Sequence, residues 1–471
     1  MSESSDRPST SATGRLPVRT KLGFGVCDLG GNLFFTALGF YAAIYLTDTV
    51  GIAAGVAGTI LLLGKIVDAF WDPILGHLSD NTVTRWGRRR PYIFLGSIPL
   101  AVAMWWFWTN PRISDATEAA VWGFAAFVLL NVTYSVVNIP YSSLTPELTA
   151  DYNERSSLNG FRFMFAAVGT LLGAVSVGPI VAAFGGGPGL DSSRGYSMAG
   201  LLFALIMMAT AMTTSLSVRE PGRTGTPKAD KGFFKAYVGV FKNRPFVIVL
   251  FGYTLNLIGL TLLQTAIPYY FNYIYAGWPG IENPQSLQTL AMGLLIVVAM
   301  VFIPVSVLVS KRLGKKVAWQ ICFFILGSAS LVIFFLGHVL GPYFFIGMMV
   351  YAGIGVGFGY VAPYAMVPDT IEVDVARTGK RNEGAFYGMY LFMSKIGQAI
   401  AWQAGLLVLA LGHYVANEAQ TESARLAIRF LAGPLPAVVL FGALVLVQFY
   451  PLDAKTYDEL IAKGKGEGTK G

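Results

Sequence analysis

The chain has 471 residues, of which 54% are hydrophobic and only 13% are charged, and its formal net charge at pH 7 is +8. With a mean hydropathy of +0.57, this composition excludes a soluble globular protein and indicates a membrane protein. Twelve apolar runs, each of roughly 18 residues or more, are long enough to cross a bilayer as helices. They lie near residues 22–47, 55–78, 91–109, 120–143, 160–183, 196–216, 245–275, 288–309, 317–337, 343–366, 383–411 and 427–449.

The first 20 residues are rich in Ser, Thr and Pro, which predicts a disordered tail rather than a cleavable signal peptide. Of the 34 lysines and arginines, 27 fall in the two tails and the even-numbered loops, whereas the odd-numbered loops hold only Arg112, Arg194 and Arg425. Because positive residues hold helix ends in the cytoplasm, we expect both termini on the cytoplasmic side of a cell (inner) membrane. The basic charge therefore reflects topology and does not indicate a nucleic-acid partner.

Three charged side chains lie on one face of the helix expected over residues 55–78. Lys65, Asp68 and Asp72 are three and four residues apart, which places the two carboxylates about 6 Å apart at Cβ. Two carboxylates this close in a low dielectric both stay ionised only when a cation binds between them; otherwise one takes a proton. We interpret the pair as a cation site. The alternative is that Lys65 pairs with Asp68 only to hold helix packing.

The chain repeats itself at a shift of about 223 residues. PYSSLTPE from Pro140 matches PYAMVPD from Pro363 with one residue dropped, and the basic loops near residues 88 and 311 fall opposite each other. This repeat predicts an all-α membrane protein with twelve transmembrane helices in two pseudo-symmetric six-helix bundles, the major facilitator fold. The expected parts are a disordered cytoplasmic tail over 1–21, a first bundle over 22–216, a cytoplasmic linker over 217–244, a second bundle over 245–449 and a cytoplasmic tail over 450–471.

Several stretches of the chain resemble one known family. They are KLGFGVCDLGGN, YLTDTVG, KIVDAFWDPILGHLSDNTVTRWGRRRPY, VVNIPYSSLTPELTADYNER and VPDTIEVDVARTGKRNEGAFYG. These stretches are similar to the signature stretches of the glycoside-pentoside-hexuronide:cation symporters, the family of melibiose permease. The resemblance implies cation-coupled uptake of a sugar or sugar derivative by alternating access.

The resemblance also implies roles for the two aspartates. In the family, the residues that match Asp68 and Asp72 coordinate the coupling ion. Trp71 stands where the family permease has an asparagine that helps to bind sodium, and Ser135 stands where it offers a threonine hydroxyl. We therefore expect Asp68, Asp72 and Ser135 to bind Na⁺ or H⁺, and the sequence leaves the choice between these ions open.

Substrate-binding residues are expected near the bilayer midplane, between the two bundles. Asn32 and Asn138 align with two acids that bind sugar in the family permease, so hydrogen-bonding capacity is kept while both negative charges are lost. Arg162 and Lys395 match cationic residues of the family, and we therefore expect that the sugar can be anionic. The alternative for Arg162 is a side chain that extends to the membrane interface.

The helix that carries Lys395 adds two substrate candidates. Gln398 and Trp402 follow Lys395 by three and seven residues, so one helix face is expected to present a cation, an amide and an indole to the sugar. Two alternatives stay open. Lys395 is a counter-ion for the two aspartates, or Trp402 serves packing or anchoring at the interface.

A third group of charged residues is expected to form a gating network. Most lie near the cytoplasmic ends, where they look like the family's loop networks, in which charge pairs between the bundles hold the outward-open state. The group consists of Lys65, Asp80, Arg88, Asp369, Arg377 and Arg381. Solvated loop charges of little energetic weight are the alternative.

The sequence thus predicts a monomeric secondary symporter in the lipid bilayer, with a sugar and a monovalent cation as its partners and without a cofactor. A lysolipid symporter is the alternative, because lipid carriers share the DxxxD element and would use the same cationic residues for a headgroup phosphate. We expect no metal site, since the three histidines lack ligand spacing. We also expect no enzymatic activity, because no nucleophile, base and orienting group converge.

Overall fold

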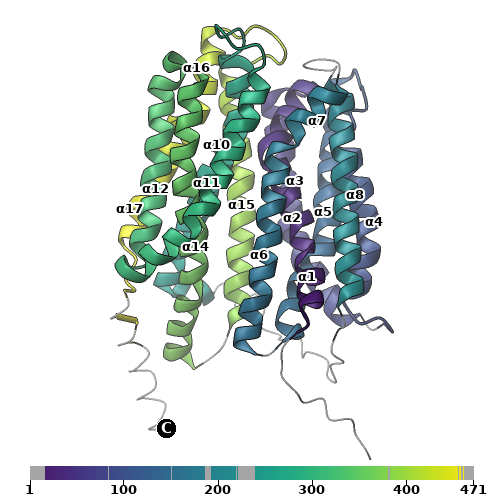
Figure 1. Ribbon diagram of the computed structural model, residues 1–471, viewed down its shortest axis with the longest axis vertical. Helices are drawn as coiled ribbons and strands as arrows, with labels where there is room; N and C mark the ends of the chain where they lie inside the picture. The colour runs from purple at the N-terminus through teal and green to yellow at the C-terminus, as the bar shows by residue number, and fades with distance from the viewer. Residues whose placement is uncertain are drawn as a thin grey trace, which may run out of the picture.

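The computed structural model describes residues 16–82, 84–149, 151–185, 192–218, 220, 239–379, 382–453, 456–457 and 460. Its helices run side by side along the long axis of the molecule (Figure 1). We call the side at which α1 (Val18–Gly25) lies the terminal side, and the opposite side, at which α7 and α16 lie, the far side. Residues 1–15, 221–238 and 461–471, which hold much of the predicted tails and linker, lie outside the described ranges.

The first half of the molecule begins with a span that α1 opens and a π-helical turn closes on the far side. Its elements after α1 are α2 (Cys27–Ile44), the π turn η1 (Tyr45–Thr49), α3 (Ala54–Asn81), α4 (Arg90–Phe107), α5 (Ala116–Leu148), α6 (Tyr152–Val175), α7 (Val177–Phe184) and α8 (Ser193–Ser217). α3 therefore runs from the far side to the terminal side, and α4 returns.

The second half repeats this alternation. Its elements are η3 (Val240–Lys242), α10 (Arg244–Tyr269), η4 (Tyr270–Ile274), α11 (Pro284–Leu313), α12 (Lys315–Val332), η5 (Ile333–Gly337), α13 (His338–Leu340), α14 (Pro342–Thr378), α15 (Glu383–Leu411), α16 (Glu422–Ala432) and α17 (Pro434–Gln448). The last predicted run, 427–449, consists of parts of two helices because Gly433 leaves the helical conformation and Pro434 begins the next helix.

In the part of the chain that the structure describes, eleven helices or joined helices are long and apolar enough to cross a membrane. α4 provides one further span. Its 18 residues include Arg90, Trp105 and Trp106, which lower its mean hydropathy. The predicted all-α fold, with twelve spanning helices in two six-helix halves, agrees with this arrangement (Figure 1).

Side-chain caps stabilise the first turns of several helices. The capping residues of α5, α6, α10, α11 and α16 are Asp115, Asp151, Asn243, Asn283 and Thr421. Each accepts a hydrogen bond from a backbone N–H that has no partner within its helix, which stabilises the helix start by about 1 kcal/mol.

Helices of the first half pack directly against helices of the second half. α3 packs against α15, α2 against α10 and α6 against α11, whereas α4 packs with α8 and α12 with α17 within their own halves. Figure 1 shows the first half, coloured purple to blue, beside the second half, coloured green to yellow. Functional side chains on α2, α3, α6 and α15 are therefore carried by helices that meet the opposite half.

Candidate functional site

Lys395 joins the two aspartates across the boundary between the halves. Its Nζ atom lies 2.8 Å from Asp68 Oδ2 and 2.6 Å from Asp72 Oδ2. The two aspartates lie one turn apart on α3 of the first half, while Lys395 lies on α15 of the second half. The ammonium therefore occupies the place between the carboxylates in which the sequence predicts a coupling cation.

Three more side chains surround the two aspartates. Ser135 Oγ of α5 lies 2.8 Å from Asp68 Oδ1 and 2.8 Å from Asp72 Oδ1. Lys65 Nζ lies 3.4 Å from Asp68 Oδ2 and donates a hydrogen bond of 2.7 Å to Asn131 Oδ1. The structure thus brings Lys65, which was predicted as a gating residue, to the predicted cation site. We call these residues, together with Lys395, the carboxylate cluster.

The carboxylate cluster is balanced in charge and is more exposed at one end. Two lysines and two aspartates have a formal charge of zero, and such pairing offsets part of the cost of burying each charge. Lys65 and Asp68 are 1% and 2% exposed, whereas the side chains of Asp72 and Lys395 are 27% and 18% exposed. An ion that enters from outside the cluster therefore reaches Asp72 first.

Asp28 of α2 and Arg162 of α6 form a second buried ion pair. Arg162 Nε lies 2.6 Å from Asp28 Oδ2, and Nη2 lies 3.2 Å from Oδ1, so the pairing is bidentate. The Tyr141 hydroxyl donates to the same carboxylate, and Arg162 Nη1 donates to Thr145 Oγ1 at 2.9 Å. Both charges are therefore satisfied by partners within the first half.

Asp28 is a half-buried charged residue that was not among the predicted site residues, although the sequence held a signal for it. Asp28 lies inside the first apolar run, and the rule that singles out Asp68, an acid within a membrane span, applies equally to it. In this conformation Asp28 pairs with Arg162, and the two aspartates of α3 pair with Lys395, in agreement with the alternative that Lys395 is their counter-ion. Contact of either cation with an anionic sugar stays a prediction. Asn131 was missed as well, and its only signal was a polar residue in an apolar run.

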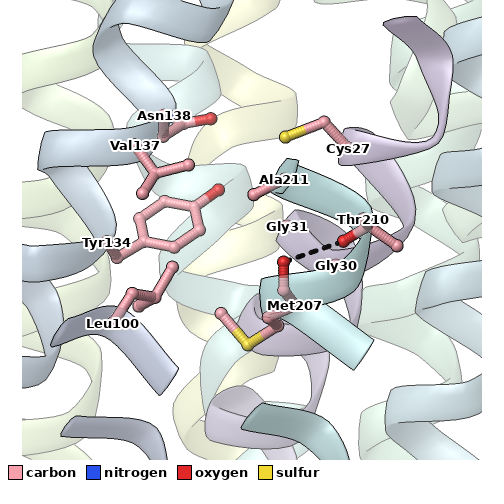
Figure 2. A pocket seen from close by; sticks show the side chains of 10 residues that line it. All are labelled: Cys27, Gly30, Gly31, Leu100, Tyr134, Val137, Asn138, Met207, Thr210 and Ala211. Atoms are coloured by element: carbon pink, nitrogen blue, oxygen red, sulfur yellow. Dashed lines mark hydrogen bonds between the residues drawn. The ribbon is translucent and has the colours of Figure 1, made fainter. Parts of the chain in front are cut away.

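The two asparagines expected at the sugar site have different surroundings. Asn32 donates a hydrogen bond of 2.8 Å to the backbone oxygen of Asp28, one turn earlier. Asn138 lines a cavity of about 20 Å³ inside the first half, together with Cys27 and Tyr134 (Figure 2). A cavity of this size has room for about one water molecule. Contact of either asparagine with a sugar stays a prediction.

Gln398 and Trp402 lie on α15, nearer to the far side of the molecule than Lys395 does. Trp402 is 3% exposed, and its ring meets that of Phe127 of the first half edge-on, with 6.0 Å between the centroids. Gln398 is half-buried. In this conformation Trp402 packs between the halves, and a role in sugar binding stays a prediction for both residues.

Comparison with known proteins shows the family of this chain. The description MFS/sugar transport protein belongs to a family profile that matches residues 23–454. The chain belongs to this family. An uncharacterized symporter of Synechocystis sp. is 30% identical, over 95% of this chain and 96% of its own. The isoprimeverose transporter of Lactiplantibacillus pentosus is 29% identical, over 93% of this chain and 89% of its own.

A solved structure supports the fold of this transporter. A mutant of the nucleoside transporter NupG matches it with a TM-score of 0.66, over 91% of this chain and 99% of that chain. At 13% identity this similarity concerns the fold alone, and it confirms the predicted major facilitator fold. The family match confirms the resemblance to sugar symporters and the prediction of a transporter rather than an enzyme.

Asp48, at the end of the first span, links the two halves on the far side of the transporter. Its carboxylate accepts hydrogen bonds from the hydroxyls of Tyr273 and Tyr414, at 2.5 and 2.6 Å. Asn417 Nδ2 donates to its backbone oxygen at 2.8 Å. All three partners belong to the second half, and Asp48 is only 8% exposed. The far side is therefore closed by hydrogen bonds between the halves.

Several of the predicted gating residues lie near the terminal side. In this conformation each of them forms an ion pair within its own half of the transporter. Asp80 lies 2.7 Å from Arg89, and Asp369 lies 2.6 Å from Lys315. Arg88 lies 2.8 Å from a glutamate of the first half. The remaining members are Arg377, which is exposed, and Arg381, which lies outside the described residues. Pairing between the halves in another conformation stays a prediction.

Proposed function

We propose that this protein is a secondary active symporter that couples the entry of Na⁺ or H⁺ to the uptake of a sugar by alternating access. The observation that carries the proposal is the ammonium of Lys395, supplied by one half, between two carboxylates supplied by the other. A relative named as an isoprimeverose transporter supports a sugar as the substrate. The distribution of positive residues favours the terminal side as the cytoplasmic side of the membrane.

An uncharged sugar fits the centre of the molecule best. Arg162 is held in a bidentate pair with Asp28, and Lys395 is shared by two aspartates. In this conformation neither cation is left to attract the carboxylate of an acidic sugar, whereas sugar hydroxyls can share hydrogen bonds with the Asp28–Arg162 pair. We therefore propose a neutral glycoside as the substrate class.

Movement of the halves changes the partner of the two aspartates. When Lys395 moves away with the second half, Asp68 and Asp72 lose their shared ammonium and repel each other in a low dielectric. An incoming cation, or a proton on one carboxylate, replaces the lost charge. Because the cation and Lys395 compete for one place, cation binding favours one arrangement of the halves and its release favours the other. This competition is the coupling step of the proposal.

The position of Ser135 favours a proton as the coupling ion. Its oxygen lies 2.8 Å from both carboxylates, but a hydroxyl carries one hydrogen and donates to one carboxylate at a time. Once Lys395 has moved away, a proton on the other carboxylate supplies the hydrogen for the second bond. Na⁺ is the alternative, because the two carboxylates and the hydroxyl are oxygen ligands of the kind that hard cations prefer.

Uptake into liposomes tests the proposal. Purified protein in liposomes receives isoprimeverose, methyl glucoside or glucuronate under a proton gradient, a sodium gradient or no gradient. We expect a neutral sugar to accumulate under one gradient. We expect Asp68→Asn and Asp72→Asn to lower this accumulation at least about tenfold, because an amide offers no charge to the cation.

The matched control for these variants is Asp115→Asn. Asp115 is an exposed N-cap of α5, and asparagine caps a helix about as well as aspartate. We expect this control to accumulate sugar at the wild-type level. Wild-type accumulation by both Asp68→Asn and Asp72→Asn would contradict the cation site, and a wild-type protein that accumulates none of the sugars under either gradient would contradict sugar symport.

A further inference from the structure

Three tyrosines of the second half pack together on α10, α14 and α15. The rings of Tyr253 and Tyr390 are stacked, with 4.4 Å between the centroids and an angle of 11° between the planes. Tyr364 meets both rings edge-on, at 6.0 and 6.2 Å, and its hydroxyl lies 3.2 Å from that of Tyr253. Tyr390 is buried, whereas Tyr364 is 56% exposed. This group, which we call the tyrosine cluster, thus presents one ring at its surface.

The internal repeat relates the tyrosine cluster to the ion pair of the first half. The second residues of PYSSLTPE and PYAMVPD are Tyr141 and Tyr364, which correspond in the repeat. Tyr141 contacts Asp28 and Arg162, and Tyr364 contacts the other two tyrosines. By the order of the spans, α10 corresponds to α2, and α15 corresponds to α6. The second half therefore carries aromatic rings on the helices that correspond to those of the ion pair.

The tyrosine cluster and the ion pair lie at a similar depth from the terminal side. Tyr253 and Tyr390 lie nine and seven residues after the first residues of α10 and α15, and Arg162 lies ten residues after that of α6. At 1.5 Å per residue these depths differ by about one helix turn. α10 and α15 also pack against α2 and α3 of the first half. Two of the three helices that carry the tyrosine cluster therefore meet the first half at the boundary between the halves.

Anchoring in lipid explains the position of the tyrosine cluster less well than contact with a ligand does. Tyrosines that anchor a protein in the bilayer gather at the membrane interfaces, whereas Tyr253 and Tyr390 lie about 10 to 14 Å along their helices. The hydroxyls of Tyr253 and Tyr364 also pair with each other, as expected for polar groups that lack water partners. The cluster is therefore suited to a ligand between the halves.

We propose that the tyrosine cluster is the second-half wall of the substrate site and that the exposed ring of Tyr364 stacks on a neutral sugar. The inference rests on the proposed sugar transport and adds the residues that hold the ring. A sugar has apolar C–H faces, which pack on aromatic rings, and hydroxyls, which bond to charged groups. The tyrosine cluster supplies the first contact and the Asp28–Arg162 pair supplies the second. Aromatic walls with a few polar groups are typical of small-molecule sites.

Variants of Tyr364 separate the ring from its hydroxyl. The probe is whichever of isoprimeverose and methyl glucoside the wild-type protein takes up faster. We expect Tyr364→Ala to raise KM about tenfold, because the apolar contact with the sugar is lost. Tyr364→Leu keeps apolar volume without an aromatic face and is expected to raise KM as well. Tyr364→Phe keeps the ring and is expected to stay within about twofold of the wild-type KM. The control is Tyr343→Ala, which changes a tyrosine that is 69% exposed at the far-side end of the same helix.

The outcomes separate this inference from the proposed function. A wild-type KM in Tyr364→Ala overturns the inference. An equal rise in Tyr364→Phe also overturns it, because the effect would then belong to the hydroxyl contact with Tyr253. The unfolding temperatures of the purified variants are expected to stay near the wild-type value, because Tyr364 is exposed, so a change in KM reports on sugar binding. If the wild-type protein accumulates no sugar, the proposal of sugar symport is wrong. If the wild-type protein accumulates sugar and the Tyr364 variants have the wild-type KM, only the proposed role of the tyrosine cluster is wrong.

Discussion

At the scale of the residue, Asp28 determines the charge of the central site. A bare guanidinium in a membrane protein would be costly and would attract an acidic ligand. The bidentate contact with Asp28 and the bond from Tyr141 neutralise Arg162 within the first half. In the proposed site, the same carboxylate would accept hydrogen bonds from sugar hydroxyls, a role that Asn32 and Asn138 cannot fill with a negative charge. One carboxylate thus accounts for the proposed preference for a neutral substrate over an anionic one.

Asp28→Asn is expected to change the preference of the transporter between neutral and acidic sugars. Loss of the carboxylate leaves Arg162 without its counter-ion, so an acidic sugar can supply the missing charge. We expect the ratio of glucuronate to methyl glucoside uptake in liposomes to rise about tenfold or more, since charge-assisted hydrogen bonds are among the strongest. Asp28→Glu, which keeps the charge, serves as the control. An unchanged ratio in Asp28→Asn would show that Asp28 does not set this preference.

At the scale of the element, glycines allow α2 and α6 to approach closely. A Cβ atom on Gly169 of α6 would lie 2.2 Å from the backbone oxygen of Leu29, and one on Gly173 would lie 2.7 Å from that of Leu33. Backbone atoms cannot move aside as the end of a flexible side chain can. Small residues at such contacts let membrane helices pack by van der Waals contact, in the absence of a hydrophobic driving force. This contact also holds Asp28 of α2 against Arg162 of α6.

Gly169→Ala is expected to destabilise the protein, because the added methyl group forces the two helices apart. We expect a loss of about 1–3 kcal/mol in the free energy of unfolding, measured as a lower unfolding temperature in detergent. The matched control is Gly160→Ala on the same helix, where a Cβ atom meets nothing within 4 Å. Alanine favours a helix over glycine by about 1 kcal/mol, so the control should not lose stability. Equal unfolding temperatures for the two variants would contradict the close contact.

At the scale of the whole molecule, the two halves are closed on the far side and more open toward the terminal side. The Asp48 contacts join the halves on the far side. α3 runs toward the terminal side, and Asp72, its more exposed aspartate, lies nearer that side than Asp68. If the terminal side is cytoplasmic, as we propose, this conformation faces inward. Alternating access then requires the hydrogen bonds of Asp48 to break.

Asp48→Ala is expected to shift the transporter toward conformations that are open on the far side. The variant removes an acceptor shared by Tyr273 and Tyr414, so we expect the open fraction to rise about tenfold, the change that about 1.4 kcal/mol produces. Spin labels at Ser114→Cys and Glu418→Cys, on exposed far-side segments of the two halves, measure the distance between the halves. Cys27 and Cys322 are buried, which limits labelling elsewhere.

The control for this shift is Glu282→Ala, which removes an exposed acid from another far-side segment. We expect its distance distribution to match that of the wild-type protein. A distribution for Asp48→Ala that also matches the wild type would mean that Asp48 does not hold the far side closed.

Much of the fold could be predicted because membrane spans depend on local composition. Each run of about 20 apolar residues crosses the bilayer on the strength of its own residues, so the twelve spans and the two halves follow from hydropathy and from the repeat. Hydropathy does not predict that the helix is interrupted at Gly433 and Pro434, because both residues lie within one apolar run. The charged residues of α3 could be singled out for the same local reason, and Lys395 was already an alternative partner for them.

The pairing of charges could not be predicted, because it depends on contacts between distant parts of the chain. Asp28 and Arg162 are 134 residues apart in sequence and are brought together by the packing of α2 on α6. Lys395 reaches Asp68 and Asp72 from the other half of the molecule. Electrostatic attraction depends on separation in space, and sequence spacing reports that separation only within one helix. The sequence alone therefore determined the spans and the charged residues within them, whereas only the tertiary structure decided which charges neutralise each other and so left the centre of the molecule uncharged.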